Sequence, residues 1–261
     1  MVRMVRMERR ARATGGRDRR LQHLGLALVF AGLGLAGCSG GLSVERVGPK
    51  PGPDQKLVLL LHGYGAAGDD LVGLAKDLSG ELPSVTFLMP AAPHRVGVSG
   101  RSWVPSFSAP SREEYAQRLV IEAADTRAKL WRLIDEARGS GVACSDIVVG
   151  GFSMGGRMAI EVATHAPPGC ALGGLVVMSG GGMDELPLPE TSATTVRALV
   201  THGKSDSIVP RVKGIAAAKA LLKLGSDVRW LSFDGGHQIP RPVREAVGAF
   251  LRGEAVGTTV P

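Results

Sequence analysis

From Gln55 onward, short apolar stretches alternate with stretches of helical spacing, and this alternation restricts the possible folds more than any other feature of the chain. Such alternation is typical of a parallel sheet that is covered by helices on both faces. The strand-like stretches are KLVLLLHG, SVTFLMP, SDIVV, LGGLVVMS, VRALV and VRWLSF. The sequence therefore predicts a single α/β domain over residues 55–253 with a mostly parallel central sheet.

A serine lies between glycines directly after one of these predicted strands, in GGFSMGGRM, residues 150–158. The stretch from Gly151 to Gly155 fits the pattern G-x-S-x-G, in which a strand turns sharply into a helix and exposes the serine hydroxyl above the sheet. Glycine is needed two residues before and two after the serine, where a side chain would meet neighbouring backbone. The pattern predicts that Ser153 is a nucleophile, although the motif alone also occurs by chance in a chain with 37 glycines.

A serine nucleophile needs a histidine that takes its proton and an acid that orients the histidine. His237 lies in FDGGHQIP, after the last predicted strand, where the order serine, acid, histidine expects the base. Asp206 lies in THGKSDSIVP after the preceding strand and is the predicted acid. Asp184 and Asp234 are its rivals, because each also follows a predicted strand. A structural role for His237 is the alternative.

Two backbone N–H groups are expected to bind the oxyanion that forms during acyl transfer. One is that of Met154, which follows the nucleophile, and the other comes from the loop after the first predicted strand. That loop reads HGYG, and we predict Tyr64 as the second donor. A plain glycine turn is the alternative. For His62 and His202, which each precede a glycine at a strand end, we expect hydrogen bonding within loops.

The segment AAPHRVGVSGRSWVPSFSAP after the second strand is predicted to be a loop, and loops of this length in compact domains are usually functional. Ser111 with Glu114 three residues later forms a capping box, which predicts a helix running to Ala137.

Several motifs in this order and spacing resemble the phospholipase/carboxylesterase family, which includes acyl-protein thioesterases, within the α/β-hydrolase fold. They are LHGYGAAGDD, MPAAPHR, GFSMGG, HGKSDSIVP and the GGH loop. The resemblance implies a catalytic triad of Ser153, Asp206 and His237, and oxyanion donors at Tyr64 and Met154.

The resemblance also implies that the loop carrying Trp103 lines the acyl pocket and that Trp103 binds substrate. The chain departs from the family pattern at two places, and both bear on the choice of substrate more than on the catalytic reaction. Met154 stands where the family usually has glutamine, and Val104 to Ser106 replace the acidic residue that usually follows the tryptophan.

These features predict a serine carboxylesterase that cleaves carboxylic esters or thioesters through an acyl-enzyme. A secreted serine peptidase or a feruloyl or polyester esterase on the same fold is one alternative. A catalytically dead lipoprotein that serves as a binding module is another. No cofactor or metal is expected, because the chain has neither a zinc-spaced Cys/His cluster nor a phosphate-binding loop.

The net charge of +7 is concentrated at the N-terminus, where residues 1–37 contain eight arginines against Glu8 and Asp18. The rest of the chain is therefore close to neutral. Nucleic-acid-binding domains carry a basic patch or stripe on the fold itself. We therefore expect no nucleic-acid partner.

The basic segment is followed by the apolar stretch LGLALVFAGLGLAG, which has the length of a signal-peptide core. It ends in Leu35-Ala36-Gly37-Cys38, which resembles the bacterial lipobox. We predict a lipoprotein signal peptide over 1–37, lipidation at Cys38 and anchorage, for instance through palmitate, to the bacterial cell envelope, with the outer membrane favoured. An ordinary signal peptide and a twin-arginine signal at Arg19-Arg20 are the alternatives.

Residues 38–54 are rich in Gly, Ser and Pro and are predicted to be a flexible tether, and residues 254–261 a frayed tail. Cys144 and Cys170 each precede a predicted strand. Because adjacent parallel strands begin at the same edge of a sheet, the two cysteines are candidates for a disulfide, with two buried thiols as the alternative.

Overall fold

The computed structural model describes residues 41–183, 186–187, 192 and 194–261. The predicted signal peptide 1–37, the predicted lipidation site Cys38 and the rival acid Asp184 lie outside these residues. Within the described part of the chain, no helix has the length and apolar character needed to cross a membrane.

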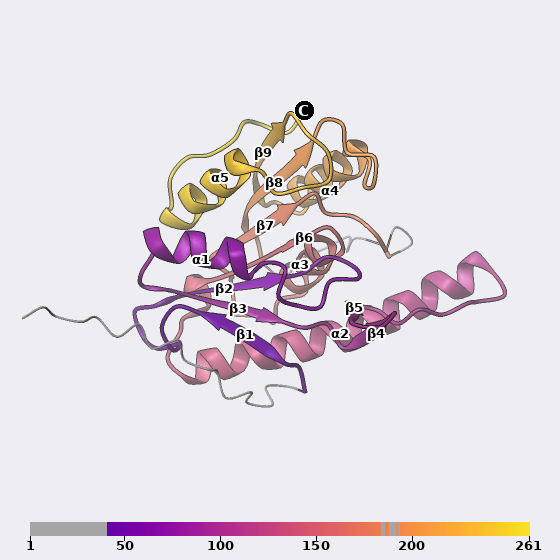
Figure 1. Ribbon diagram of the computed structural model, residues 1–261, viewed down its shortest axis with the longest axis horizontal. Coiled ribbons are helices and arrows are strands. Elements are labelled where there is room, and N and C mark those ends of the chain that lie inside the picture. Colours follow the sequence, from indigo (N-terminus) through magenta and orange to yellow (C-terminus); the bar gives the residue numbers. More distant parts are fainter. Residues whose placement is uncertain (1–40, 184–185, 188–191, 193) are drawn as a thin grey trace, which may run out of the picture. The chain divides into compact units, whose positions relative to one another are not determined.

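A seven-stranded sheet with the order β1-β3-β2-β6-β7-β8-β9 forms the centre of the fold (Figure 1). Its strands are β1 Val44–Val47, β2 Lys56–Leu61, β3 Val85–Pro90, β6 Ile147–Phe152, β7 Gly174–Met178, β8 Arg197–Gly203 and β9 Asp227–Phe233. All neighbouring pairs are parallel except β1 and β3. The predicted, mostly parallel α/β sheet is therefore confirmed.

Helices cover both faces of this sheet, with α1 and α5 on one face and α2, α3 and α4 on the other (Figure 1). Their bounds are α1 Val72–Glu81, α2 Arg112–Gly139, α3 Met154–Thr164, α4 Arg211–Lys223 and α5 Arg241–Arg252. Alternate residues of β2 enter the two apolar cores, which explains why this strand is an unbroken apolar run. The predicted cap of α2 is present, since the Glu114 N–H donates to Ser111 Oγ at 3.1 Å.

Two segments whose composition predicts flexible chain contribute residues to the central sheet. β1 lies within the predicted tether 38–54 and pairs antiparallel with β3, and Leu42 before it is buried. In the predicted tail 254–261, Thr258 and Trp230 exchange backbone hydrogen bonds of 2.8 Å at the free edge of β9. At β1 and Thr258 the predictions of a tether and of a frayed tail were wrong for the same reason: an edge strand has unpaired N–H and C=O groups that a nearby segment can satisfy, whatever its own composition.

The predicted long loop after β3 contains a two-stranded hairpin, formed by β4 His94–Val96 and β5 Gly100–Ser102. The backbone of this hairpin is joined to the loop after β2, because the Gly65 N–H donates to the Arg101 carbonyl and the Arg101 N–H to the Ala66 carbonyl, each at 2.9 Å. The hairpin therefore supports the carboxyl edge of the sheet.

A disulfide joins Cys144 and Cys170, whose Cα atoms are 5.3 Å apart. The two cysteines precede β6 and β7, as the sequence predicts, and the bond ties the amino-terminal edge of the sheet together at these neighbouring strands. This edge lies opposite the edge at which the strands end.

Removing this disulfide with the double substitution Cys144→Ser and Cys170→Ser is expected to lower the free energy of unfolding by about 3 kcal/mol, because the bond closes a loop of 26 residues in the unfolded chain. Urea unfolding with and without dithiothreitol measures the loss. Reductant should move the wild-type midpoint and leave the double variant unchanged; an unmoved wild-type midpoint would show that the bond contributes nothing.

Candidate active site

Ser153 lies at the end of β6 in a backbone conformation that side-chain-bearing residues rarely adopt, with φ 54° and ψ −121°. Such strain costs on the order of 1–3 kcal/mol and persists only where surrounding structure enforces it. Here the Ser153 N–H donates to the Met178 carbonyl at 2.9 Å, and the Ser153 carbonyl accepts from the Gly181 N–H at 3.1 Å. Hydrogen bonds to β7 and to the loop after it therefore hold the serine in the predicted sharp turn.

The glycines on either side of the serine are required by close backbone contacts. A Cβ atom on Gly151 would overlap the backbone of Gly155, and one on Gly155 would overlap the carbonyl oxygens of Leu61 and His62. The predicted steric reason for both glycines is confirmed. The contact of Gly155 also brings the start of α3 against the loop that follows β2.

Gly155→Ala is expected to destabilise the protein by about 1–3 kcal/mol and to lower its activity, because the added methyl group forces the start of α3 away from β2. Gly73→Ala in α1 is the matched control. Its Cβ would meet no atom within 4 Å, so helix propensity alone should stabilise the fold by about 0.5–1 kcal/mol. Thermal unfolding of both variants measures the two shifts, and a shift of the same sign in both would contradict the steric argument.

Asp206 and His237 are brought together from the ends of β8 and β9, with His237 Nδ1 at 2.8 Å from Asp206 Oδ2. Because a carboxylate only accepts, Nδ1 carries a hydrogen, and in the neutral ring Nε2 then keeps its lone pair. This is the tautomer that can take a proton from a hydroxyl. The side chain of Asp206 is fully buried, while that of His237 retains 14% of its exposure.

The carboxyl group of Asp206 is held in its charged form. Burial raises its pKa, but hydrogen bonds from His237 and from the N–H groups of Val209 and Ile208 outweigh burial and place the pKa below its usual 3.8. The two backbone donors reach Oδ1 at 2.8 Å and 3.0 Å. At neutral pH the buried carboxylate is therefore negative and fixed in orientation.

The imidazole of His237 packs against the ring of Phe152, the residue before the nucleophile, with ring centroids 4.6 Å apart. Within the described residues, no hydrogen bond joins the Ser153 hydroxyl to His237. In enzymes without bound substrate this hydrogen bond is often long and tightens only in the complex. The structure thus gathers the three predicted residues at one edge of the sheet, with the histidine beside the nucleophile turn.

Asp234, one of the rival acids, has a different partner. Its carboxylate is 2.8 Å from Lys204 Nζ, and its side chain is 90% exposed. An exposed ion pair of this kind contributes little to the stability of the fold, and it does not orient His237. Of the two candidate acids that the structure describes, Asp206 is the one that contacts His237; Asp184 lies outside the described residues.

The two predicted oxyanion donors lie on either side of the contact between α3 and the loop after β2. A Cβ atom on Gly63 would come within 3.5 Å of Ser153 Cβ, so the Gly63-Tyr64 segment lies beside the nucleophile. In the described part of the chain, neither the Tyr64 N–H nor the Met154 N–H donates to a protein acceptor. Both groups remain available for a ligand oxygen.

Trp103 is completely buried, contrary to the prediction that it binds substrate. Its indole Nε1–H donates to the His62 carbonyl at 2.8 Å, and Thr126 Oγ1 donates to the Trp103 carbonyl at 2.7 Å. The side chain therefore supports the loop after β2 from within the core. The sequence shows that a tryptophan lies in this loop, but not which way the hairpin turns it.

His202 is a second histidine beside the acid, and the sequence did not single it out for this position. It is fully buried, and its Nε2 lies 2.8 Å from the Val209 carbonyl and 3.4 Å from Asp206 Oδ2. It therefore bonds within the loop, as expected, and at the same time fixes the turn that carries Asp206.

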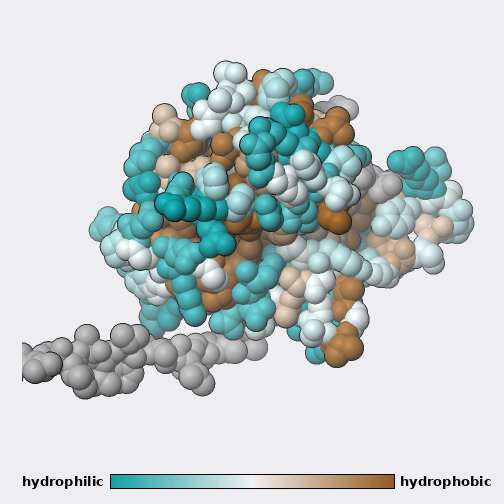
Figure 2. All heavy atoms as spheres, turned by 45° about the horizontal axis from the view of Figure 1, so that its top comes forward, coloured by the Kyte–Doolittle hydropathy of each residue, from teal (hydrophilic) through white to brown (hydrophobic). Residues whose placement is uncertain are grey.

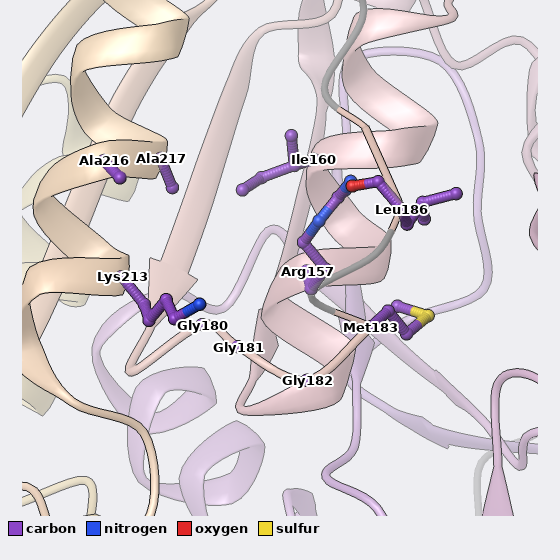
Figure 3. A pocket seen from close by; sticks show the side chains of 10 residues that line it. All are labelled: Arg157, Ile160, Gly180, Gly181, Gly182, Met183, Leu186, Lys213, Ala216 and Ala217. Carbon is purple, nitrogen blue, oxygen red and sulfur yellow. The ribbon is translucent and has the colours of Figure 1, made fainter. Parts of the chain in front are cut away.

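A cavity of about 220 Å³ opens beside the loop after β7, which contacts the nucleophile turn through Gly181 (Figure 3). Backbone of Gly180 to Gly182 forms one wall, and Arg157 and Lys213 reach toward it from α3 and α4. Arg157 is bound to Glu161 at 2.8 Å and to the Leu186 carbonyl at 2.8 Å. The arginine thus anchors the loop after β7 to the nucleophile helix.

Apolar side chains are exposed near the ends of the strands. Tyr64 follows β2, and Ile208 and Val212 follow β8; they are 57%, 70% and 64% exposed. Hydrophilic and hydrophobic residues are interspersed on the face shown in Figure 2.

Among the described residues, no group of three or more His, Cys, Asp or Glu side chains could hold a metal ion.

The chain is similar to several known proteins. The chain is 28% identical over 233 residues to acyl-protein thioesterase 1 of Gibberella zeae, covering 82% of this chain and 97% of that protein. It is 30% identical over 195 residues to esterase YpfH of Escherichia coli K12, covering 72% and 78%. The crystal structure of esterase PE8 matches with a TM-score of 0.68 and 28% identity, over 82% of this chain and 99% of that one. The sequence model of the phospholipase/carboxylesterase family matches residues 42–253, and the chain therefore belongs to this family.

Proposed function

We propose that the protein is a serine esterase that hydrolyses carboxylic esters or thioesters through an acyl-enzyme. The observation that carries this proposal is the Asp206–His237 pair, with its free Nε2, packed beside the strained turn of Ser153. Relatives named as thioesterases and esterases support ester and thioester bonds over the peptide bonds of the peptidase alternative.

In the proposed reaction, Ser153 Oγ attacks the carbonyl carbon while its proton passes to His237 Nε2. The N–H groups of Tyr64 and Met154 donate to the oxyanion of the tetrahedral intermediate. The bond to the leaving alcohol or thiol then breaks, and the leaving group takes the proton from His237. Water, deprotonated by the same nitrogen, releases the acid and regenerates the hydroxyl.

Labelling by a fluorophosphonate tests the enzyme proposal, because this probe reacts rapidly with an activated serine. We expect labelling of the wild-type protein and its loss in Ser153→Ala. An unlabelled wild-type protein would favour the alternative of a dead binding module. A chain-length series of nitrophenyl esters and thioesters, run beside matched amides, then defines the substrate class, and a preference for amides would exclude the esterase.

We further propose that the protein is exported and anchored to the bacterial envelope through a lipid on Cys38, with the outer membrane favoured. The apolar stretch before Cys38 motivates this, and a disulfide is a bond that persists in oxidising compartments. Membrane fractionation of wild type and Cys38→Ala tests the anchor. Wild-type protein in the soluble fraction would refute it.

A further inference from the structure

The ring of His62 lies under the loop that contains the proposed oxyanion donor Tyr64. The side chain is 1% exposed, and both ring nitrogens have backbone partners. Nδ1 is 2.7 Å from the Gly63 carbonyl oxygen, and Nε2 is 2.9 Å from the Ala92 nitrogen. The ring also packs against Trp103, with centroids 4.8 Å apart.

These two partners fix the form of the ring. A carbonyl oxygen only accepts, so Nδ1 must carry a hydrogen, and the Ala92 N–H only donates, so Nε2 must not. The neutral Nδ1–H tautomer satisfies both contacts. A protonated ring would set an Nε2–H against the Ala92 N–H in a buried position, where an unpaired donor is costly.

The bond from His62 acts on the peptide unit that carries the donor. The Gly63 carbonyl and the Tyr64 N–H belong to the same planar unit, and the described peptide bonds are trans. In a trans peptide the C=O and N–H point in opposite directions. Holding the Gly63 oxygen at the ring therefore turns the Tyr64 N–H to the other side of the loop.

The preceding peptide unit is held in the same way. Trp103 Nε1–H donates to the His62 carbonyl at 2.8 Å, which fixes the Gly63 N–H. The loop contacts Ser153 at Gly63, so its orientation is set directly beside the nucleophile.

Charged groups around the ring favour different protonation states. Burial lowers the pKa of His62 from its ordinary 6.5, and Arg101 acts in the same direction, while the Gly63 carbonyl, Asp70 and Asp69 oppose it. Burial also raises the pKa of Asp70. The fold therefore favours the neutral ring, and this contribution is lost as the pH falls below 6.5 through the lower pKa of the folded state.

We propose that His62 is a positioning residue for acyl transfer. Its neutral imidazole orients the Tyr64 N–H toward the oxyanion, and protonation of the ring removes this orientation and so weakens oxyanion binding. The proposal rests on the esterase function proposed above. It assigns to His62 a role in transition-state binding and none in substrate binding.

Two amide substitutions of similar size separate the ring's two contacts. His62→Asn places an amide nitrogen near the position of Nδ1 and keeps a donor for the Gly63 carbonyl. His62→Gln reaches instead toward the Nε2 position and the Ala92 N–H. We expect His62→Asn to keep kcat at pH 8 within about tenfold of wild type, and His62→Gln to lose about 100-fold with KM nearly unchanged.

A role that is only structural would affect the two variants equally or raise KM, and either result would overturn the proposal. His165→Asn, the same substitution at the partly exposed end of α3, should keep wild-type kinetics. The affinity of an aryl boronic acid, which forms a tetrahedral adduct with the serine, should fall with kcat across the series.

The pH dependence of wild-type kcat/KM tests the proposal without any folding risk. Because the pKa of His62 lies below its ordinary 6.5 and its proton must be absent for activity, the acid limb of the wild type should include one proton more than that of His62→Asn, at pH values below 6.5. The limb of the wild type should therefore be the steeper of the two.

An acid limb that is equally steep in the wild type and in His62→Asn would overturn the proposal, because any additional proton would then belong to another group such as Asp70. Loss of the esterase proposal itself has a different signature: the wild-type protein would then fail to react with the fluorophosphonate at any pH.

Discussion

Ser153→Ala is expected to lower kcat for the hydrolysis of 4-nitrophenyl butyrate by about 10⁶-fold, with KM changed little, because the substitution removes the atom that forms the acyl-enzyme. The alanine keeps the backbone bonds from Ser153 to Met178 and from Gly181 to Ser153, so the turn has no reason to move. Steady-state kinetics with purified protein at pH 8 measure the loss.

The residual rate of this variant is informative. The Tyr64 and Met154 N–H groups remain, and triad-free enzymes of this kind retain about 10³- to 10⁴-fold catalysis over water. Ser79→Ala is the matched control, since Ser79 lies on α1 and its hydroxyl, as far as the structure describes the chain, donates only to the Lys76 carbonyl at 3.0 Å. Comparable losses in both variants, or substantial activity in Ser153→Ala, would remove Ser153 from the mechanism.

The positions of the nucleophile, acid and base could be predicted because each depends on local sequence at a strand end. Glycines flank Ser153 for a steric reason that holds in any strand-to-helix turn of this type. Parallel strands then bring residues that follow β6, β8 and β9 to one edge, however far apart they lie in the chain. Apolar runs and their order are enough to make that prediction.

What the sequence could not give is the direction of individual side chains and the pairing of edge strands. Trp103 was predicted at the substrate and is buried beneath the loop, because the hairpin β4–β5 turns its end into the core. The edges of the sheet are completed by β1 and Thr258, whose pairing depends on which backbone groups are left free.

The two histidines at strand ends illustrate the same limit. His62 and His202 both precede a glycine, which suggested bonding within loops, and both make such bonds. Which peptide unit each ring holds depends on its rotamer and on residues from other elements, such as Ala92 from the segment after β3. The sequence therefore shows that a histidine lies next to a strand end, but it does not show which backbone N–H group that histidine orients.

Asp206→Asn is expected to lower kcat by about 10⁴-fold while leaving the fold intact. The asparagine Oδ1 can still accept from the N–H groups of Ile208 and Val209, so the turn retains its bonds. At Oδ2 the carboxylate is replaced by an NH₂ group, which donates toward His237 Nδ1. The imidazole must then carry its hydrogen on Nε2, and a nitrogen that already holds a proton cannot take one from Ser153.

Asp234→Asn is the control that decides between the two acids, because Asp234 is three residues from the base but its exposed carboxylate binds Lys204. Loss of such a surface pair costs about 0–1 kcal/mol of stability, and we expect kcat within about twofold of wild type. Equal damage from both substitutions would mean that the charge near His237 matters and its geometry does not. A large loss confined to Asp206→Asn, with unchanged thermal unfolding, would show that a single hydrogen bond of 2.8 Å sets the protonation of the base.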